Sequence, residues 1–77
     1  MKISSSFGLV LRILRISKGL SQEELAVRLG MNSNTHISRL ESGAQTPNLD
    51  MVFRLAEALE IKASQIITMM EEQEQNN

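Results

Sequence analysis

The sequence of 77 residues contains no cysteine and only one histidine. Without cysteine, neither a disulfide nor a thiolate metal site can form. A single histidine cannot build a metal site alone, and no nucleophile, histidine and acid set can be assembled around it. The phosphate-binding pattern GxxxxGKS/T is also absent. We therefore expect a protein that is not an enzyme and that holds no metal and no cofactor.

Aromatic residues and long apolar runs are also scarce. The two phenylalanines, with no tryptophan or tyrosine, exclude a stacking platform for single-stranded nucleic acid. No run reaches the roughly 18 apolar residues of a membrane span. The apolar N-terminal stretch is interrupted by Arg12, Arg15 and Lys18, and no small-residue cleavage site of a signal peptide follows it. We therefore expect a single cytoplasmic domain over residues 1–77, with no membrane partner.

The net charge of −1 is unevenly divided along the chain. Residues 1–40 carry six basic and two acidic side chains, whereas residues 41–77 carry two basic and seven acidic ones. The halves therefore have net charges of +4 and −5. Such asymmetry suggests a basic face for a polyanion and an acidic face turned away from it. Local potential, rather than net charge, steers a protein to DNA.

Glycines and capping residues divide the chain into short helical segments, and no segment alternates with the period of a strand. We expect helices over residues 7–18 after a cap at Ser5 or Ser6, from a cap at Ser21 to Gly30, from a cap at Ser33 to Gly43, from a cap at Asn48 to about residue 60, and over residues 63–72. Ser21 and Glu24 have the spacing of a capping box. The sequence thus predicts an all-α fold of five helices, ordered over about residues 5–72, with a frayed tail at 73–77.

The second and third predicted helices, joined by a turn that contains Gly30, form a helix-turn-helix. This arrangement alone is weak evidence, because many helical bundles contain it. However, KGLSQEELAVRLG, ISRLESG, a proline and LAEALEI closely resemble the Xre/Cro family of regulators, which includes the phage lambda and 434 repressors. The resemblance spans about residues 7–67. It implies a lambda-repressor-like domain that binds double-stranded DNA and regulates transcription.

The resemblance also implies which side chains meet DNA. The expected DNA-binding residues are Gln22, Ser33, Asn34, Thr35, His36, Ser38, Arg39, Ser42 and Gln45. Gln22 matches a glutamine that touches a phosphate in the family and braces the recognition helix. Asn34, Thr35, His36 and Arg39 match base-reading positions, and their chemistry suits that task because asparagine can pair with adenine and arginine with guanine. The plainer alternative for each is a solvated helix face; for Ser38 the two readings are equally supported.

Two charged residues match a structural pair of the family. Arg15 and Glu41 are expected to join the first helix to the end of the third as an ion pair. Losing one partner of a partly buried pair strands the other charge. We therefore assign both residues to the scaffold rather than to chemistry.

Two positions depart from the family pattern. Gly30 and the buried Ile37 are seven residues apart, whereas relatives have six, so Asn32 or Ser33 is an extra residue in the turn. The register of the first turn of the recognition helix is therefore open. Glu60 also stands where glycine commonly ends the fourth helix, so we expect a less sharply defined turn there.

The first helix carries a second apolar face opposite Phe7 and Leu11. The residues expected at this second surface are Leu9, Ile13, Ile16, Ile67, Met69 and Met70. A helix that is apolar all round is covered on both sides or lies at an interface. The C-terminal segment could cover this face, but we favour a homodimer, which would present two recognition helices to a palindromic operator.

Several roles fit such a regulator. The size and single-domain organisation resemble those of restriction–modification controller proteins, while a phage or plasmid repressor fragment and a stand-alone regulator remain open. The alternative from another class is an antitoxin-type module that holds a toxin and binds DNA secondarily. The expected partners are thus double-stranded DNA and a second copy of the chain.

Overall fold

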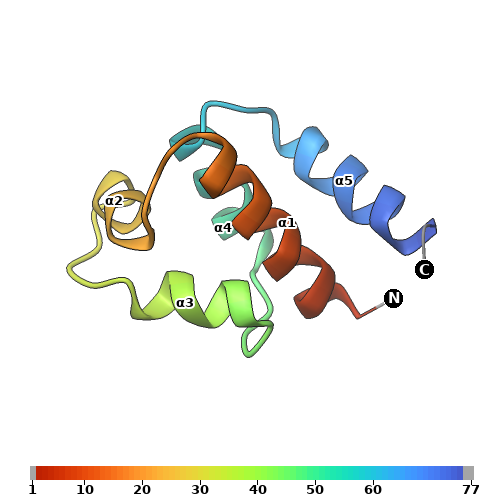
Figure 1. Cartoon of the computed structure of the whole chain (residues 1–77), viewed down its shortest axis with the longest axis horizontal. Helices are drawn as coiled ribbons and strands as arrows, with labels where there is room; N and C mark the ends of the chain where they lie inside the picture. Colours follow the sequence, from red (N-terminus) through yellow and green to blue (C-terminus); the bar gives the residue numbers. More distant parts are fainter. Residues whose placement is uncertain (1, 76–77) are drawn as a thin grey trace.

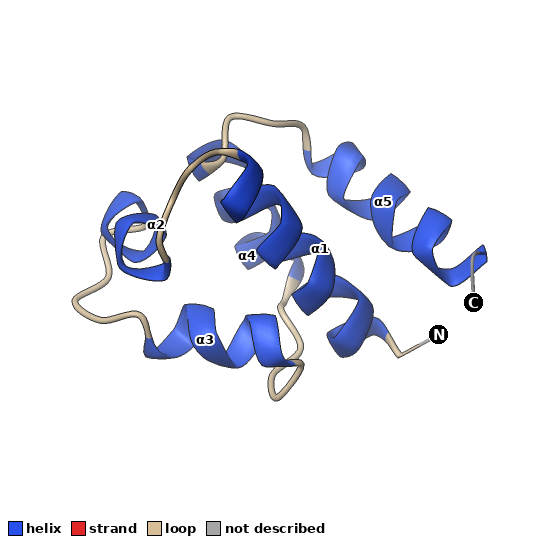
Figure 2. Ribbon diagram, viewed as in Figure 1, coloured by secondary structure: helices blue, strands red, loops and turns tan. Residues whose placement is uncertain are grey.

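The computed structural model describes residues 2–75, and this part of the chain forms helices without a strand. The helices are α1 (Ile3–Ser17), α2 (Gln22–Arg28), α3 (Thr35–Ser42), α4 (Leu49–Ala58) and α5 (Ala63–Gln75). Figure 1 shows α1 across the middle with α4 behind it, α2 and α3 at one end, and α5 along the other flank. Figure 2 shows the short loops that join them. The predicted all-α, five-helix fold is confirmed.

The core takes side chains from every helix. Its largest fully buried members are Phe7, Val10, Leu11, Leu25, Ile37, Leu40, Leu55, Leu59 and Ile66. These residues recur at the three- and four-residue spacing that places side chains on one face of a helix. No polar or charged residue among those described is buried with them, so burial of apolar surface drives folding.

Helix α1 begins earlier than the sequence predicted. Lys2 is its N-terminal flanking residue and supplies no side-chain cap, so the predicted cap at Ser5 or Ser6 is wrong. Ser6 instead lies inside the helix, where its hydroxyl donates to the carbonyl oxygen of Met70 at 3.4 Å. This bond ties α1 to α5. Helix α5 continues to Gln75, beyond the predicted end at residue 72, and the rest of the predicted tail, 76–77, lies outside the described residues.

The predicted helix starts at Ser21 and Asn48 are confirmed. Ser21 Oγ accepts from the Glu24 backbone N–H at 3.0 Å, and the Ser21 N–H donates to Glu24 Oε1 at 2.9 Å. The backbone hydrogen bond from Ser21 lowers the pKa of the Glu24 carboxyl. Asn48 Oδ1 accepts from the Met51 N–H at 2.8 Å. These caps satisfy donors that the first turn of a helix leaves unpaired.

Four helices end in the same kind of turn, in which a backbone N–H bonds a carbonyl five residues earlier. The bonds are Leu20 to Arg15 at 3.1 Å, Met31 to Ala26 at 2.9 Å, Ala44 to Arg39 at 3.0 Å and Ile61 to Ala56 at 2.9 Å. The residue before each donor has a left-handed backbone. At the fourth turn this residue is Glu60, with φ of 58°. The expectation of a poorly defined turn there is wrong, because Glu60 adopts the conformation that glycine would.

The crossing of α1 and α3 depends on Gly8. A Cβ atom on Gly8 would lie 2.5 Å from the carbonyl oxygen of Leu40 and 2.6 Å from that of Glu41. Both atoms belong to the backbone of α3 and cannot move aside as a side chain would. A residue without Cβ is therefore required where α1 meets the last turn of α3.

The six apolar residues expected to form one dimer surface occupy different environments. Met70 is only 6% exposed and belongs to the core, so its place on that surface is corrected. Met69 is half-buried and packs against the core. Leu9, Ile13, Ile16 and Ile67 remain 42–56% exposed. Within the monomer, the second apolar face of α1 therefore remains partly exposed beside α5.

We predict that Glu60→Gly raises the free energy of unfolding by about 1 kcal/mol, because a left-handed backbone is costly for residues with a Cβ. Urea unfolding would measure the change. Glu60→Ala is the matched control: it removes the exposed contact with Arg28, where the nearest N and O atoms are 3.7 Å apart, but keeps the Cβ. If both variants gained equally, backbone strain would not be the cause.

We predict the opposite sign for Gly8→Ala. Replacing glycine by alanine inside a helix ordinarily adds up to about 1 kcal/mol of stability, but here the new methyl group clashes with backbone, and overpacking costs about 1–3 kcal/mol. Thermal and urea unfolding should show a clear loss. Ser5→Ala, at an exposed position of α1, serves as the control and should be nearly neutral; a Gly8→Ala variant as stable as the parent would refute the close crossing.

Candidate nucleic-acid interface

Helices α2 and α3 form the helix-turn-helix, and α3 is fixed by its inward side. Ile37 and Leu40 of α3 are both 0% exposed, and Leu25 and Ala26 of α2 are 0% and 1% exposed. Helices α2 and α3 pack against each other. The inward residues leave the opposite side of α3, which includes Thr35, Ser38 and Arg39, facing outward.

The turn before α3 absorbs the extra residue. Helix α3 begins at Thr35, and Asn34 precedes it without a side-chain cap. The predicted cap at Ser33 is therefore wrong; the Ser33 hydroxyl instead bonds the Thr35 hydroxyl at 3.4 Å. The expected place of Asn34 inside the first helical turn is also corrected. Because the added residue lengthens the turn, Asn34 stays outside the helix and faces α2.

A continuous hydrogen-bond network joins the turn to α2, α3 and α1. Asn34 Nδ2 donates to Gln22 Oε1 and to Glu23 Oε1, each at 3.2 Å. Gln22 Nε2 donates to Glu41 Oε1 at 3.0 Å. Arg15 completes the network through its Nε, which lies 2.5 Å from Glu41 Oε2, and its Nη2, which lies 3.1 Å from Glu41 Oε1. The network braces both ends of α3 against the preceding helices.

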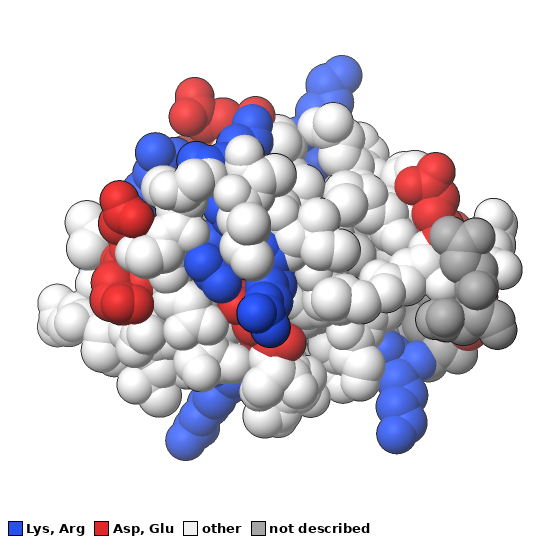
Figure 3. Space-filling model, viewed as in Figure 1, with Lys and Arg blue, Asp and Glu red and all other residues white. Residues whose placement is uncertain are grey.

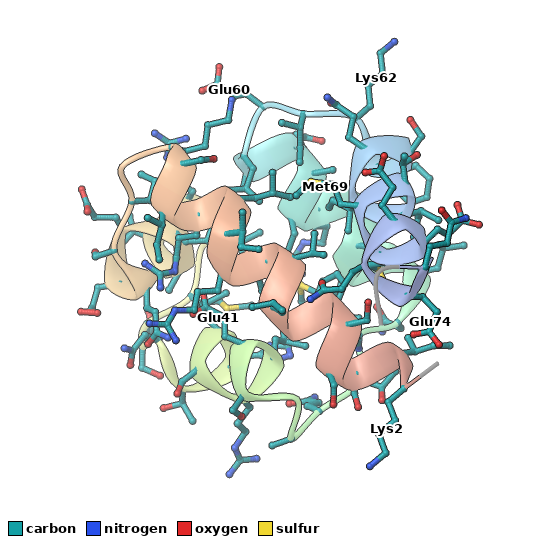
Figure 4. All side chains as sticks on the ribbon, turned by 45° about the vertical axis from the view of Figure 1, so that its right-hand side comes forward. Lys2, Glu41, Glu60, Lys62, Met69 and Glu74 are labelled. Atoms are coloured by element: carbon teal, nitrogen blue, oxygen red, sulfur yellow. The ribbon has the colours of Figure 1, made fainter. Side chains whose placement is uncertain are left out.

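The expected partners Arg15 and Glu41 form an ion pair that is largely sheltered from water. Their side chains are 12% and 5% exposed, and Arg15 Nη1 also donates to the carbonyl oxygen of Leu20 at 2.8 Å. The hydrogen bond to Glu41 raises the pKa of Arg15, against the lowering effect of burial. Figure 4 shows Glu41 between α1 and α3. A bidentate pair of this kind fixes orientation as well as distance.

The side chains that were expected to bind DNA fall into two groups by exposure. Ser33, Thr35, Ser38, Arg39, Ser42 and Gln45 are exposed, whereas Gln22, Asn34 and His36 are half-buried. The Ser42 hydroxyl donates to the Arg39 carbonyl oxygen at 3.1 Å. In contrast, nothing in the described residues bonds the Arg39 guanidinium. A cation without a partner on the outward side of α3 is free to meet a ligand.

Two shallow hollows flank α3, and both include residues that the sequence interpretation missed. One is lined by Met31, Asn32, Ser33, Thr35, His36, Arg39 and Gln45. The other is lined by Arg12, Arg15, Gln22, Ser38, Glu41 and Ser42. The length of the turn is the sequence feature that points to Met31 and Asn32 as site residues. Arg12 lies one helical turn before Arg15, and this spacing is the feature that points to Arg12.

Charge on this side of the molecule is mixed rather than uniform. Figure 3 shows basic side chains gathered over α1 close to α3, with carboxylates over α2 and at the far end of α5. Glu23 and Glu24, both exposed, belong to the first turn of α2. The positive charge near α3 is therefore local.

We predict that Glu41→Ala lowers the free energy of unfolding by about 3 kcal/mol, because it leaves the sheltered Arg15 charge unpaired. Arg15→Met combined with Glu41→Leu should recover much of this loss. A double-mutant cycle by urea unfolding gives the coupling between the two residues. A coupling energy near zero would contradict the bracing role of the pair.

Comparison with known proteins agrees with this geometry. A helix-turn-helix family model matches residues 11–66. An uncharacterized HTH-type transcriptional regulator, y4dJ, from Sinorhizobium fredii is 37% identical over 59 residues, which cover 77% of this chain and 75% of that protein. The cryptic phage CTXphi transcriptional repressor RstR from Vibrio cholerae is 32% identical over 62 residues, which cover 80% of this chain and 55% of the repressor.

Solved structures show the same arrangement. The restriction-modification controller protein C.AhdI from Aeromonas hydrophila has a TM-score of 0.74 and 38% identity, covering 79% of this chain and 91% of its own. The clp gene regulator ClgR from Corynebacterium glutamicum has a TM-score of 0.86 over 92% of this chain and 74% of its own. Its 22% identity supports the fold alone. The chain therefore belongs to the Xre-like helix-turn-helix family of transcriptional regulators.

Proposed function

We propose that this regulator acts in the cytoplasm as a homodimer that binds a palindromic operator, with α3 of each copy in the major groove. The observation that carries the proposal is the outward side of α3. Its exposed polar residues stand opposite the buried Ile37 and Leu40, and the network from Arg15 to Asn34 holds the helix in place. A helix presented in this way has the geometry for reading base edges.

The side chains divide into readers and supports. The free guanidinium of Arg39 suits a bidentate contact with guanine, and Thr35 and His36 lie at the start of α3, which approaches the bases. Asn34 acts mainly as a support, because its amide nitrogen already bonds Gln22 and Glu23. Gln22 supports α3 and keeps a second amide hydrogen for a phosphate.

Phosphate contacts set the position of a protein on the duplex without reading sequence. We assign this role to exposed hydroxyl and amide groups on α3 and next to its ends. They are Ser33, Ser38, Ser42 and Gln45. Arg12, which lines the hollow beside Ser38, joins them.

Control of a restriction–modification system is the regulatory role that we favour. The supporting observation is the 38% identity to the controller protein C.AhdI, 91% of which is covered. Restriction and methyltransferase genes next to the gene, with a bound operator upstream of them, would support this role. A position within a prophage would instead favour a repressor role similar to that of RstR.

Arg39→Ala should weaken binding to the selected operator by about 1–3 kcal/mol and relax preference at one base pair in each half-site. The free energy of unfolding of this variant should not change, because the Arg39 guanidinium has no partner in the described residues. The operator would be selected from random duplexes with the parent protein, and affinities would be measured at fixed salt. Lys62→Ala removes the same charge between α4 and α5, where Figure 4 shows Lys62 projecting away from α3.

The control variant should lose little affinity and no specificity. If Lys62→Ala and Arg39→Ala weakened binding alike, the contribution of Arg39 would be general electrostatics rather than base reading. If the folded parent enriched no sequence from the random pool, the proposed function itself would fail.

A further inference from the structure

The turn before α3 is one residue longer than the family pattern, and its tip is exposed. The tip consists of Asn32 and Ser33, both exposed. The Ser33 hydroxyl bonds the Thr35 hydroxyl, whereas no described residue bonds the side-chain amide of Asn32. An amide offers two donor hydrogens and an acceptor oxygen. The added length therefore presents a polar group whose hydrogen-bonding capacity the fold does not use.

The tip is held on both sides. Met31 precedes it, packs against the core and donates its backbone N–H to the carbonyl oxygen of Ala26 at 2.9 Å. Asn34 follows it and donates to Gln22 and Glu23, each at 3.2 Å. Two residues alone separate these anchors, so the tip has little freedom to move. A group that is already held in place loses less entropy when it binds.

The tip lies on the same side of the molecule as the proposed base readers. Asn32 lines one hollow together with Thr35, His36 and Arg39. Thr35 and Arg39 are four residues apart on α3, so they share its outward side. Figure 1 shows the turn projecting past the start of α3 at one end of the molecule. Asn32 therefore extends the row of readers beyond the N-terminus of α3.

We propose that Asn32 reads an adenine in the major groove, next to the base pairs that α3 reaches. The inference rests on the proposed function, since it requires α3 to lie in that groove. The N-terminal part of a recognition helix approaches the base edges, and a residue just before it reaches a neighbouring pair. The amide suits adenine, because its nitrogen can donate to N7 while its oxygen accepts from the N6 amino group.

Asn34 is the other asparagine of the turn, and it cannot make the same contact. Its Nδ2 carries two hydrogens, and these are taken by Gln22 and Glu23. None is left to donate to adenine N7. The longer turn thus separates two tasks: Asn34 holds α3 in place, and Asn32 reads.

A phosphate contact is the alternative for the same amide. Phosphate oxygens only accept, so the amide nitrogen alone would take part, and the contact would be the same on every sequence. A paired contact with adenine instead uses both amide atoms and favours one base at one position. Sequence preference therefore separates the two roles.

Removal of the amide in the full-length protein is the first test. Asn32→Ala should lower affinity for the operator selected with the parent at least about tenfold, as loss of a bidentate base contact does. Reselection from random duplexes with this variant should show no preference for adenine at one position of each half-site, with the other positions unchanged. Circular dichroism melts should match those of the parent, because no described residue bonds the amide.

Gln75→Ala is the matched control. It removes another exposed amide, at the last residue of α5, at the opposite end of the molecule from the turn (Figure 1). This variant should keep both the affinity and the sequence preference of the parent.

A modified base provides a second test that leaves the protein intact. 7-Deazaadenine lacks the N7 acceptor but still pairs with thymine. Placed at the identified position of both half-sites, it should weaken binding of the parent several-fold and leave binding of Asn32→Ala unchanged. Such non-additivity marks a direct contact between the two groups that are altered.

The contrary results are distinct. If Asn32→Ala weakened binding equally on all sequences, or had no effect, the inference would be overturned, while relaxed preference in Arg39→Ala would still uphold the proposed function. If the modified base weakened binding of parent and variant alike, the adenine contact would belong to another residue. A folded parent that enriched no sequence at all would refute the proposed function and this inference with it.

Discussion

The backbone contact between α1 and α3 at Gly8 is the constraint on which the rest of the structure depends. A carbonyl oxygen lies where even a methyl group would clash, so the last turn of α3 rests directly on α1. This approach brings Glu41 within reach of Arg15, two turns further along α1. Glu41 then accepts from Gln22, and Gln22 from Asn34. The orientation of α3 thus depends on the absence of a side chain at Gly8.

The polar network lies at the rim of the core rather than within it. The described residues include no buried polar or charged residue, and none of their buried side-chain nitrogen or oxygen atoms lacks a partner. The apolar core provides the driving force for folding, and the polar network fixes the orientation of α3. Gln22 and Asn34 therefore support the fold and also border the proposed DNA interface. The Arg39 guanidinium, which bonds nothing in the described residues, is left for that proposed interface.

Local signals predicted most of the fold. Capping residues at Ser21 and Asn48 and apolar spacing within each helix reflect contacts between near neighbours in the chain, and the structure agrees with them. Contacts between distant segments were not predicted by local signals, and the Arg15–Glu41 ion pair was expected only because of the family resemblance. Glycine inside a predicted helix indicates only weak propensity, so Gly8 gave no sign of the crossing. Helical spacing also shows which residues share a face, but not which flank another helix covers; Met70 was misplaced for that reason.

The residues of the candidate site were also predicted only in part. The resemblance located α3 and its outward residues, because side-chain identity at each position carries that information. The role of Asn34 depended on one added residue in the turn, and no local signal decides whether such a residue lengthens the turn or the helix. Here the amide of Asn34 reaches Gln22 and Glu23 from outside α3, and the helix starts at Thr35. With the longer turn, Asn34 braces α3 from outside the helix, and the proposed base reading is left to the exposed residues on α3 and in the turn.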